Sequence, residues 1–301
     1  MIRQSEGNAI ELLHTGLLEE HRGLVGKLRF LSENLDIPLG WHYMLDLVWI
    51  LARAGEVADR TILDAGAGWG LLQWALAERG SLVISVDRNN RIDPGERLRR
   101  RYRLNGLRTS DLKSVTVREA WAQTRSRGYL FASYRAGRRA ARILRHRLPP
   151  KASGQVLIYD ADLARLTSLA TESVDLVVSV SALEHNQLED MGTVVDELMR
   201  VLKPGGRMFA TVAATKEVDF WHEPSGGWCL TEGTLRNVFH LGWETPSNFS
   251  TFDDRFAELV ACSELRNRLA QFYFDSGENG MPWGIWDPRY QPVGILKVKP
   301  E

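Results

Sequence analysis

The sequence predicts a doubly wound α/β fold, in which a mainly parallel sheet carries helices on both faces. Short apolar runs alternate with helical segments from about residue 61 onward, a glycine-rich turn follows the first run, and two later runs end in aspartate. Strands that alternate with helices form a parallel sheet, because each crossover helix packs on one of its faces. With two weaker strands near the C-terminus, we expect seven strands.

The individual elements follow from apolar runs and their spacing. Leucines that recur at steps of three and four predict helices over the first 55 residues, with a second helix from about 41 to 54. We therefore expect an N-terminal helical cap, 1–55, before the main domain, 56–301. Helices are expected at 71–78 and 191–202, and strands at 61–63, 82–86, 155–159, 174–180 and 207–213, with weaker ones at 242–244 and 293–298.

Composition narrows the class of protein. A chain of 301 residues with 44% hydrophobic residues can bury a large core, so disorder of the whole chain is not expected. Cys229 and Cys262 belong to no CxxC or Cys/His cluster, so we expect free thiols and no zinc site. Residues 1–10 lack the apolar core of a secretory signal, and the apolar stretch 44–52 is too short to span a bilayer. These features favour a cytoplasmic protein.

One segment is strongly basic, although the net charge of the whole chain is zero. Residues 91–151 hold 18 Lys and Arg against four Asp and Glu, a formal charge of +14, so the rest of the chain carries −14. We expect a helical insertion here, with a basic amphipathic helix over about 130–148. Three partners remain open: the chain's own acidic surface or a second copy, an anionic membrane face or polyanionic saccharide, and nucleic acid. No RNA-binding signature is present, which disfavours the last.

The glycine-rich turn is the strongest local signal. Asp64 ends the first strand, and Gly66, Gly68 and Gly70 follow at alternate positions. Glycines let a backbone turn tightly and approach a ligand, and the next helix begins with free N–H groups. A dinucleotide fingerprint needs a third glycine at position 71, where Leu71 stands. Asp64, two residues before the first glycine, instead suits the ammonium group of S-adenosylmethionine. The alternative is a glycine-rich turn that binds no ligand.

A second acid supports a nucleoside ligand. Asp87 ends the second strand, 23 residues after Asp64. An acid about 20 residues beyond such a turn can hydrogen-bond a ribose hydroxyl. The alternative is a solvated aspartate at a strand end.

These segments together resemble the class I S-adenosylmethionine-dependent methyltransferases, and most closely their small-molecule branch, the type 11 methyltransferase domain. The resemblance implies a Rossmann-like sheet, S-adenosylmethionine as cofactor and methyl transfer as the activity. It covers about 61–213 without the insertion, in the family's order, and is carried by 63–70, 86–87, 160–163, 173–179, 182–185 and 200–206.

The resemblance also implies roles for single residues. Bulky Trp69 stands where many relatives carry a small residue, which could shift the loop slightly. The implied contacts are with methionine and ribose for Asp64, Ala65, Gly66, Gly68, Trp69 and Gly70, with the ribose hydroxyls and adenine for Asp87, Arg88, Asp160, Ala161 and Asp162, and with the sulfonium for Ser179 and Val180.

His185 is the candidate catalytic residue. Methyl transfer to oxygen requires loss of a proton, and histidine titrates near neutral pH. The alternatives are that His185 only shapes the pocket, with alignment of the reactants supplying much of the rate, or that Glu184 and His185 bind a divalent metal as in some relatives. We expect no metal.

Aromatic segments supply acceptor candidates. In the family, the loop after the fifth strand covers the substrate, which points to Trp221, His222, Glu223 and Trp228. The segment 41–43 could close over the cofactor. Aromatic faces suit a sugar ring or a flat or lipidic acceptor, although core packing explains some of them equally well. The second aromatic group comprises Phe272, Tyr273, Phe274, Trp283, Trp286 and Tyr290.

The expected reaction is methyl transfer to an oxygen, less readily a nitrogen, of a small molecule, a sugar or a lipid-linked glycan. One alternative is an RNA methyltransferase that grips phosphates with the insertion. The segment 179–182 lacks the Asn-Pro-Pro-Tyr-type motif of base amino-methylation, which disfavours that activity. The other alternative is a non-catalytic scaffold that binds the cofactor. If the insertion contacts anionic lipid, the protein would sit at the inner membrane face.

Overall fold

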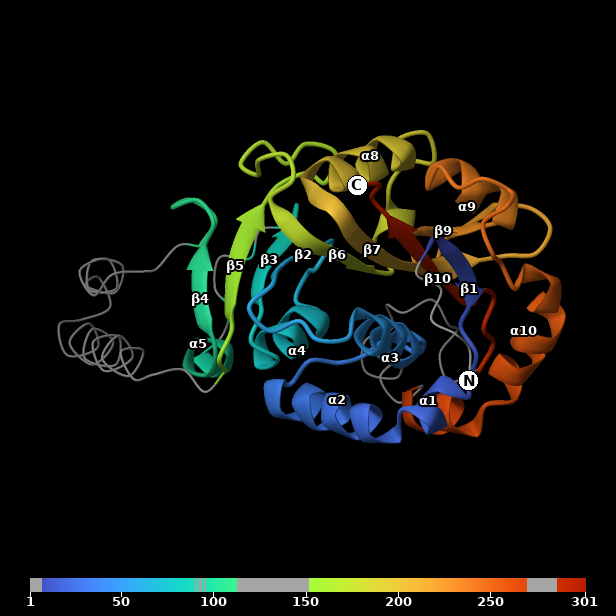
Figure 1. Cartoon of the computed structure of the whole chain (residues 1–301). Helices are drawn as coiled ribbons and strands as arrows, with labels where there is room; N and C mark the ends of the chain where they lie inside the picture. The colour runs from blue at the N-terminus through green and yellow to red at the C-terminus, as the bar shows by residue number, and fades with distance from the viewer. Residues whose placement is uncertain (1–6, 90, 92–93, 95, 113–151, 270–285) are drawn as a thin grey trace, which may run out of the picture.

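A computed structural model describes residues 7–89, 91, 94, 96–112, 152–269 and 286–301. Their strands form one mixed sheet, which confirms the expected fold class (Figure 1). The described part holds ten strands where seven were expected. Along the sheet the order is β1 (Ala9–Leu12), β10 (Gln291–Val298), β7 (Leu202–Ala214), β6 (Val174–Val180), β2 (Thr61–Ala65), β3 (Leu82–Asp87), β5 (Gln155–Asp160) and β4 (Arg103–Gly106), with β8 (Phe220–His222) and β9 (Gly227–Leu230) attached through β7.

The parallel centre of the sheet creates the position for a ligand. β2 pairs with β3 on one side and with β6 on the other, so the chain winds outward in both directions from this strand. β2, β3 and β6 are almost continuously buried, as expected for strands covered on both faces. Ligands of open α/β sheets bind beyond the carboxyl ends of the strands, where the winding direction reverses. Asp64 lies at that point, and Asp87 is in register with Asp160 of β5.

The far edge of the sheet departs from the sequence-based expectation. Residues 9–12 form β1, which pairs antiparallel with β10, so the prediction of helices throughout the first 55 residues is wrong there. Leucine spacing in such a short segment fits either structure, and pairing with a strand nearly 290 residues away decides it.

The weak strand expected at 242–244 is also absent. The segment is a turn in which Arg236 donates hydrogen bonds to the carbonyls of Gly242 and Thr245. Trp243 is 75% exposed, and the Arg236 guanidinium lies over its ring. The prediction of a strand therefore rested on one apolar side chain, which stacks on an arginine and does not enter the sheet.

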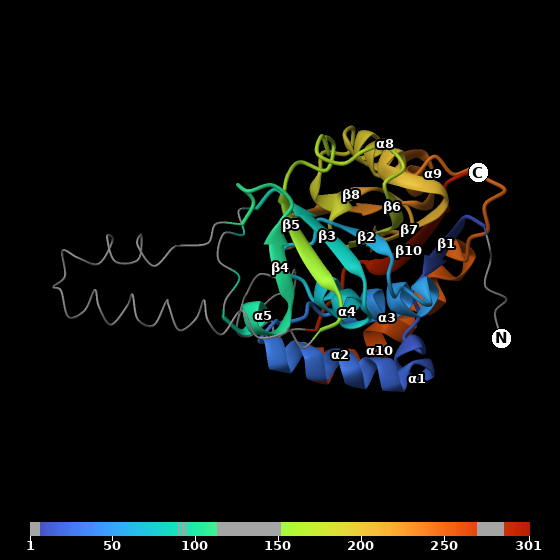
Figure 2. The same ribbon diagram turned by 60° about the vertical axis from the view of Figure 1, so that its left-hand side comes forward.

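Helices cover both faces of the sheet. One face carries α3 and α4, with α1 and α2 outside them, and the opposite face carries α8 and α9 (Figures 1 and 2). α8 shows one buried apolar stripe, as its periodicity predicts. The helices are α1 (Leu17–Glu20), α2 (Arg22–Leu35), α3 (Tyr43–Ala54), α4 (Leu72–Glu78), α5 (Glu96–Arg101), α8 (Met191–Val201), α9 (Glu232–Val238) and α10 (Phe252–Ala261), with short turns η2 (Leu183–His185), η3 (Phe249–Thr251) and η4 (Leu265–Leu269).

The beginning of the basic segment belongs to the sheet domain. α5 precedes β4, which pairs parallel with β5 and extends the sheet. The amphipathic helix expected over 130–148 lies outside the described residues. Within the described ranges, no helix combines the length and apolarity needed to cross a bilayer.

Candidate functional site

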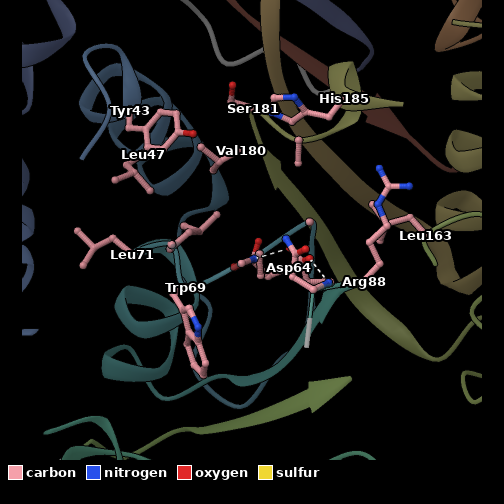
Figure 3. A pocket seen from close by; sticks show the side chains of 18 of the residues that line it. Tyr43, Leu47, Asp64, Trp69, Leu71, Arg88, Leu163, Val180, Ser181 and His185 are labelled. Carbon is pink, nitrogen blue, oxygen red and sulfur yellow. Dashed lines mark hydrogen bonds between the residues drawn. The ribbon is translucent and has the colours of Figure 1, made fainter. Parts of the chain in front are cut away.

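A cavity of about 480 Å³ opens at the carboxyl ends of β2, β3 and β6. This volume lies within the usual range for small-molecule sites. Tyr43, Ser181 and His185 lie on one side of it, across from Asp64 and Trp69 (Figure 3). The lining residues are Pro38, Leu39, Tyr43, Leu47, Asp64, Gly66, Ala67, Gly68, Trp69, Gly70, Leu71, Leu72, Asp87, Arg88, Asn89, Ala161, Asp162, Leu163, Val180, Ser181, Ala182, His185 and Asn186.

The turn after β2 requires glycine for two reasons. Gly66 and Gly68 have φ angles of +72° and +46°, which residues with a side chain rarely adopt. A Cβ atom on Gly66 would lie 2.3 Å from the Cβ of Ala182, in the segment after β6. The bare backbone therefore lets the turn approach the neighbouring strand end and form the floor of the cavity.

Asp87 connects the glycine turn to the next loop. Its Oδ2 accepts a hydrogen bond of 2.8 Å from the Gly68 N–H, and its Oδ1 accepts one of 2.7 Å from the Asn89 N–H. Both carboxylate oxygens thus hold backbone groups at the cavity wall. Each oxygen has further lone-pair capacity for hydroxyl donors.

Arg91 is a structural part of the site that sequence reasoning missed. Its buried guanidinium donates to the carbonyl oxygens of Gly68, Ser85 and Tyr159 and to the Ser85 hydroxyl. These bonds tie the glycine turn to two strand ends. In the sequence, Arg91 was counted with the basic insertion, and nothing distinguishes it from the exposed arginines nearby.

Asp64 is a fully buried acid at the cavity wall. Burial raises its pKa to about 7, the charge of Asp87 adds to this effect, and the Arg91 guanidinium opposes it. A carboxyl group in this state is suited to an incoming cation, because a nearby positive charge favours its ionised form. This observation fits the ammonium group expected for the cofactor.

His185 presents one ring nitrogen for chemistry. Its Nδ1 lies 2.8 Å from the carbonyl oxygen of Gly226. A carbonyl oxygen only accepts hydrogen bonds, so Nδ1 carries the proton and donates it. In the neutral ring, Nε2 then keeps its lone pair and can accept a proton.

Side chains from two distant segments also meet at this end. Ser181 donates its hydroxyl to Glu184 Oε1 over 2.6 Å, and Tyr43, at the start of α3, lines the cavity with Ser181. Ser181 has a φ of +45°, an unfavourable conformation for a residue with a side chain. Sequence reasoning did not single out Ser181, because backbone strain leaves no pattern in the sequence.

Three of the thirteen expected cofactor residues, Ala65, Asp160 and Ser179, do not line the cavity. Ser179 is buried beneath it and donates its hydroxyl to the carbonyl of Ala65, so this pair joins β6 to β2. Asp160 lies beside Asp87 in the sheet, and its carbonyl accepts a hydrogen bond from Arg108. These three residues lie behind the cavity wall, and the other ten line the cavity.

The four acceptor candidates lie in the β8–β9 hairpin and its turn, outside the cavity lining. Trp221 packs edge-on against Trp228, and His222 hydrogen-bonds the Ser225 hydroxyl. Glu223 is exposed at the turn. The hairpin turn contacts the cavity wall at Gly226, the hydrogen-bond partner of His185.

The other aromatic groups divide in a similar way. Of the segment 41–43, only Tyr43 lines the cavity, while Trp41 packs against Trp286 and Tyr290. Phe272, Tyr273, Phe274 and Trp283 lie outside the described residues. Cys229 and Cys262 are free thiols. No cluster of three or more potential metal ligands occurs among the residues that the structure describes.

Comparison with known proteins gives one family match. Residues 137–210 match the family model described as a methyltransferase domain. This range contains Asp160, β6 and the Glu184–His185 turn. A search of curated proteins finds no significant sequence match.

Several solved structures are distantly similar. YcgJ from Bacillus subtilis has a TM-score of 0.44 and 13% identity, over 85% of this chain and 98% of that chain. The Burkholderia thailandensis 1,6-didemethyltoxoflavin-N1-methyltransferase, solved with S-adenosylhomocysteine, has a TM-score of 0.43 and 14% identity, over 94% and 90%. The Haemonchus contortus phosphoethanolamine N-methyltransferase 2 has a TM-score of 0.43 and 14% identity, over 95% and 59%.

The family match and the sheet agree with the resemblance drawn from the sequence. Residues 137–210 are similar to a methyltransferase domain, and the sheet has the doubly wound fold that the resemblance implied.

Proposed function

We propose that the cavity binds S-adenosylmethionine and that the enzyme methylates an oxygen of a small molecule, a sugar or a lipid-linked glycan. The observation that carries this proposal is the meeting of Asp64, the glycine turn and Asp87 in one cavity with His185. Bound S-adenosylmethionine supplies an electrophilic methyl group on a positively charged sulfur. The chain's own residues bind the nucleoside and receive the acceptor's proton.

The binding roles follow from the positions of donors and acceptors. Asp87 accepts hydrogen bonds from the ribose hydroxyls, while Arg88, Ala161 and Asp162 enclose the adenine. Asp64 accepts from the ammonium group of the methionine part. Val180 lines the same cavity as His185, so it would contact the sulfonium part of the bound cofactor.

His185 is the proposed base at the acceptor end. Its Nδ1 is held by Gly226, so Nε2 faces the acceptor without a change of tautomer. A hydroxyl group that hydrogen-bonds Nε2 loses its proton as the new bond to carbon forms. Alignment of the acceptor by this hydrogen bond contributes to the rate as well.

The test is a transfer assay with labelled methyl groups against glycan, lipid and RNA fractions. We expect label in a glycan, lipid or small-molecule product. His185→Ala should lower turnover about 100-fold, a typical loss for a general base, while S-adenosylhomocysteine affinity changes less than about threefold. Glu189→Gln, an exposed neighbour outside the cavity lining, is the matched control. Unaltered turnover of His185→Ala would remove the base role, and label confined to RNA would overturn the acceptor class.

The basic segment supplies a proposed contact with anionic surfaces. Residues 113–151 hold 11 Lys and Arg and one Glu. Such a charge binds anionic lipid or polyanionic glycan electrostatically, at about 1 kcal/mol for each basic residue near a membrane surface. We propose that it holds the enzyme close to a membrane-associated acceptor.

A further inference from the structure

Three polar side chains are buried together behind the glycine turn. Gln73 of α4, Ser85 of β3 and Arg91 are each at most 2% exposed. Polar groups at this depth are costly unless they are hydrogen-bonded, and a buried charge is more costly still. Apolar side chains could fill the same space without that cost, so these three groups invite a functional explanation.

The three side chains form one connected network. Arg91 donates to the Ser85 hydroxyl, which in turn donates to the side-chain oxygen of Gln73 over 2.7 Å. The Gln73 side-chain amide then donates to the carbonyl oxygens of Gly68 and Gly70, over 3.2 and 3.0 Å. Arg91 itself donates to the Gly68 carbonyl over 3.0 Å. Two donors of the network therefore hold the same carbonyl group of the turn.

Gly68 is fixed from both sides by these contacts. Its carbonyl accepts from Arg91 and Gln73, while its N–H donates to Asp87 Oδ2. Glycine loses more conformational entropy on ordering than any other residue, so a turn rich in glycine is costly to order. Residues that hold such a turn in advance reduce the part of this cost that falls on ligand binding.

Arg91 also places a positive charge among the acids at the strand ends. Its guanidinium stays protonated at physiological pH. Burial lowers the pKa of Arg91, and the charges of Asp87, Asp64, Asp160 and Asp111 oppose this effect. Burial raises the pKa of Asp64 to about 7, the Arg91 charge lowers it, and the Asp87 charge raises it. Arg91 therefore favours the ionised form of Asp64.

We propose that Arg91 is a positioning residue for the cofactor, which holds the glycine turn in its binding shape and keeps Asp64 available as a carboxylate for the ammonium group. The proposal rests on the proposed binding of S-adenosylmethionine in this cavity. Arg91 is not among the lining residues and acts through Gly68 and Asp64, which are. It takes part in no transfer of a proton or methyl group, so its effect falls on binding.

Calorimetric titration with S-adenosylhomocysteine at pH 7 and pH 9 tests the charge of Arg91. Arg91→Gln keeps hydrogen-bond donors at this position and removes the charge. We expect Asp64 to ionise about one pH unit higher in this variant, the lower end of the effect of an adjacent opposite charge on an aspartate. The ratio of wild-type to variant affinity should then be about fivefold larger at pH 7 than at pH 9, where Asp64 is ionised in both proteins.

Arg91→Lys tests the hold on the turn. Lysine keeps the positive charge but lacks the planar fork of the guanidinium group. This variant should bind about three- to tenfold more weakly than the wild type, as the loss of one hydrogen bond gives, with the same ratio at both pH values. Arg103→Gln is the matched control, because it makes the same change of charge at an exposed position in β4, and it should match the wild type.

The outcomes separate the two effects. An equal affinity ratio at pH 7 and pH 9 for Arg91→Gln would overturn the role of the charge, and wild-type affinity of Arg91→Lys would overturn the hold on the turn. If Arg91→Gln does not fold at pH 8, Asp64→Asn is added to it. Recovery of folding supports the proposal, because the carboxyl group that Arg91 balances is then absent, and continued failure to fold overturns it in favour of a purely structural role. Absence of S-adenosylhomocysteine binding by the wild type would instead overturn the proposed function.

Discussion

At the residue scale, the site depends on acids whose surroundings set their charge. Asp64 and Asp87 lie at the ends of adjacent strands, and both side chains are buried. Asp87 is stabilised by two backbone N–H groups, whereas Asp64 has a pKa of about 7 because burial disfavours its charge. The two carboxyl groups are therefore suited to different parts of one ligand: neutral hydroxyls for Asp87 and a cation for Asp64.

This difference predicts a pH dependence of binding. In the empty cavity, Asp64 is protonated below about pH 7 and must release its proton to receive an ammonium group. S-adenosylhomocysteine affinity should therefore fall as the pH is lowered, by about tenfold between pH 8 and pH 6, as one titrating group with this pKa gives. Calorimetric titration across this range measures the effect.

Asp64→Asn is the control for that prediction. The amide cannot ionise, so the variant should bind more weakly at pH 8 and show a flat profile. A wild-type slope that survives in Asp64→Asn would assign the titration to another group.

At the element scale, the central strands and the glycine turn could be predicted from the sequence more reliably than the strands at the edges of the sheet. β6 occupies the expected residues, because a valine-rich run bounded by polar residues has no competing helical period. β1 and β4 were missed, since each has only four residues and its pairing partner lies far along the chain. The residues of β2, Asp64 and Asp87 were predictable from position and residue type alone.

Other parts of the site could not be predicted from the sequence, because their positions depend on tertiary packing. Tyr43 reaches the cavity only through packing of α3 on the sheet, and Arg91 folds beneath the glycine turn. The acceptor candidates Trp221 and Trp228 pack against each other in a hairpin. Their side-chain type indicated a ligand surface, but the alternation of the strands determines where each side chain points.

The glycine turn gives a stability prediction at this scale. Gly66→Ala would place a Cβ atom 2.3 Å from that of Ala182, in a backbone conformation with a φ of +72°. We expect a loss of about 1–3 kcal/mol in the free energy of unfolding, together with weaker cofactor binding. Thermal and denaturant unfolding measure the first effect.

Gly233→Ala is the matched control for Gly66→Ala. Gly233 lies in α9, where an added Cβ would meet no atom within 4 Å. Alanine favours a helix over glycine, so this variant should be equal to or slightly more stable than the wild type. Equal stability of Gly66→Ala and Gly233→Ala would show that the turn tolerates a side chain.

At the scale of the whole molecule, the basic segment is separate in sequence from the described cavity lining. The lining residues that the structure describes lie in 38–89 and 161–186, outside 113–151. We therefore expect replacement of 113–151 by a flexible linker of about ten Gly and Ser residues to leave S-adenosylhomocysteine affinity within about twofold. The same change should abolish co-sedimentation with phosphatidylglycerol vesicles.

The vesicle experiment contains its own controls. Binding of the full chain should be weak on phosphatidylcholine vesicles and should fade as salt screens the charges. Persistent co-sedimentation after the replacement, or binding that ignores salt, would contradict an electrostatic role for this segment.

The central claim is that a nucleoside occupies the cavity formed by the glycine turn and the strand-end acids, and calorimetric titration with S-adenosylhomocysteine tests it most directly. The wild type should bind one molecule per chain. Asp87→Ala should weaken binding about 10- to 100-fold, because a charged hydrogen-bond acceptor contributes about 1.5–3 kcal/mol. Absence of binding by the folded wild-type protein, or equal affinity of Asp87→Ala, would contradict the claim.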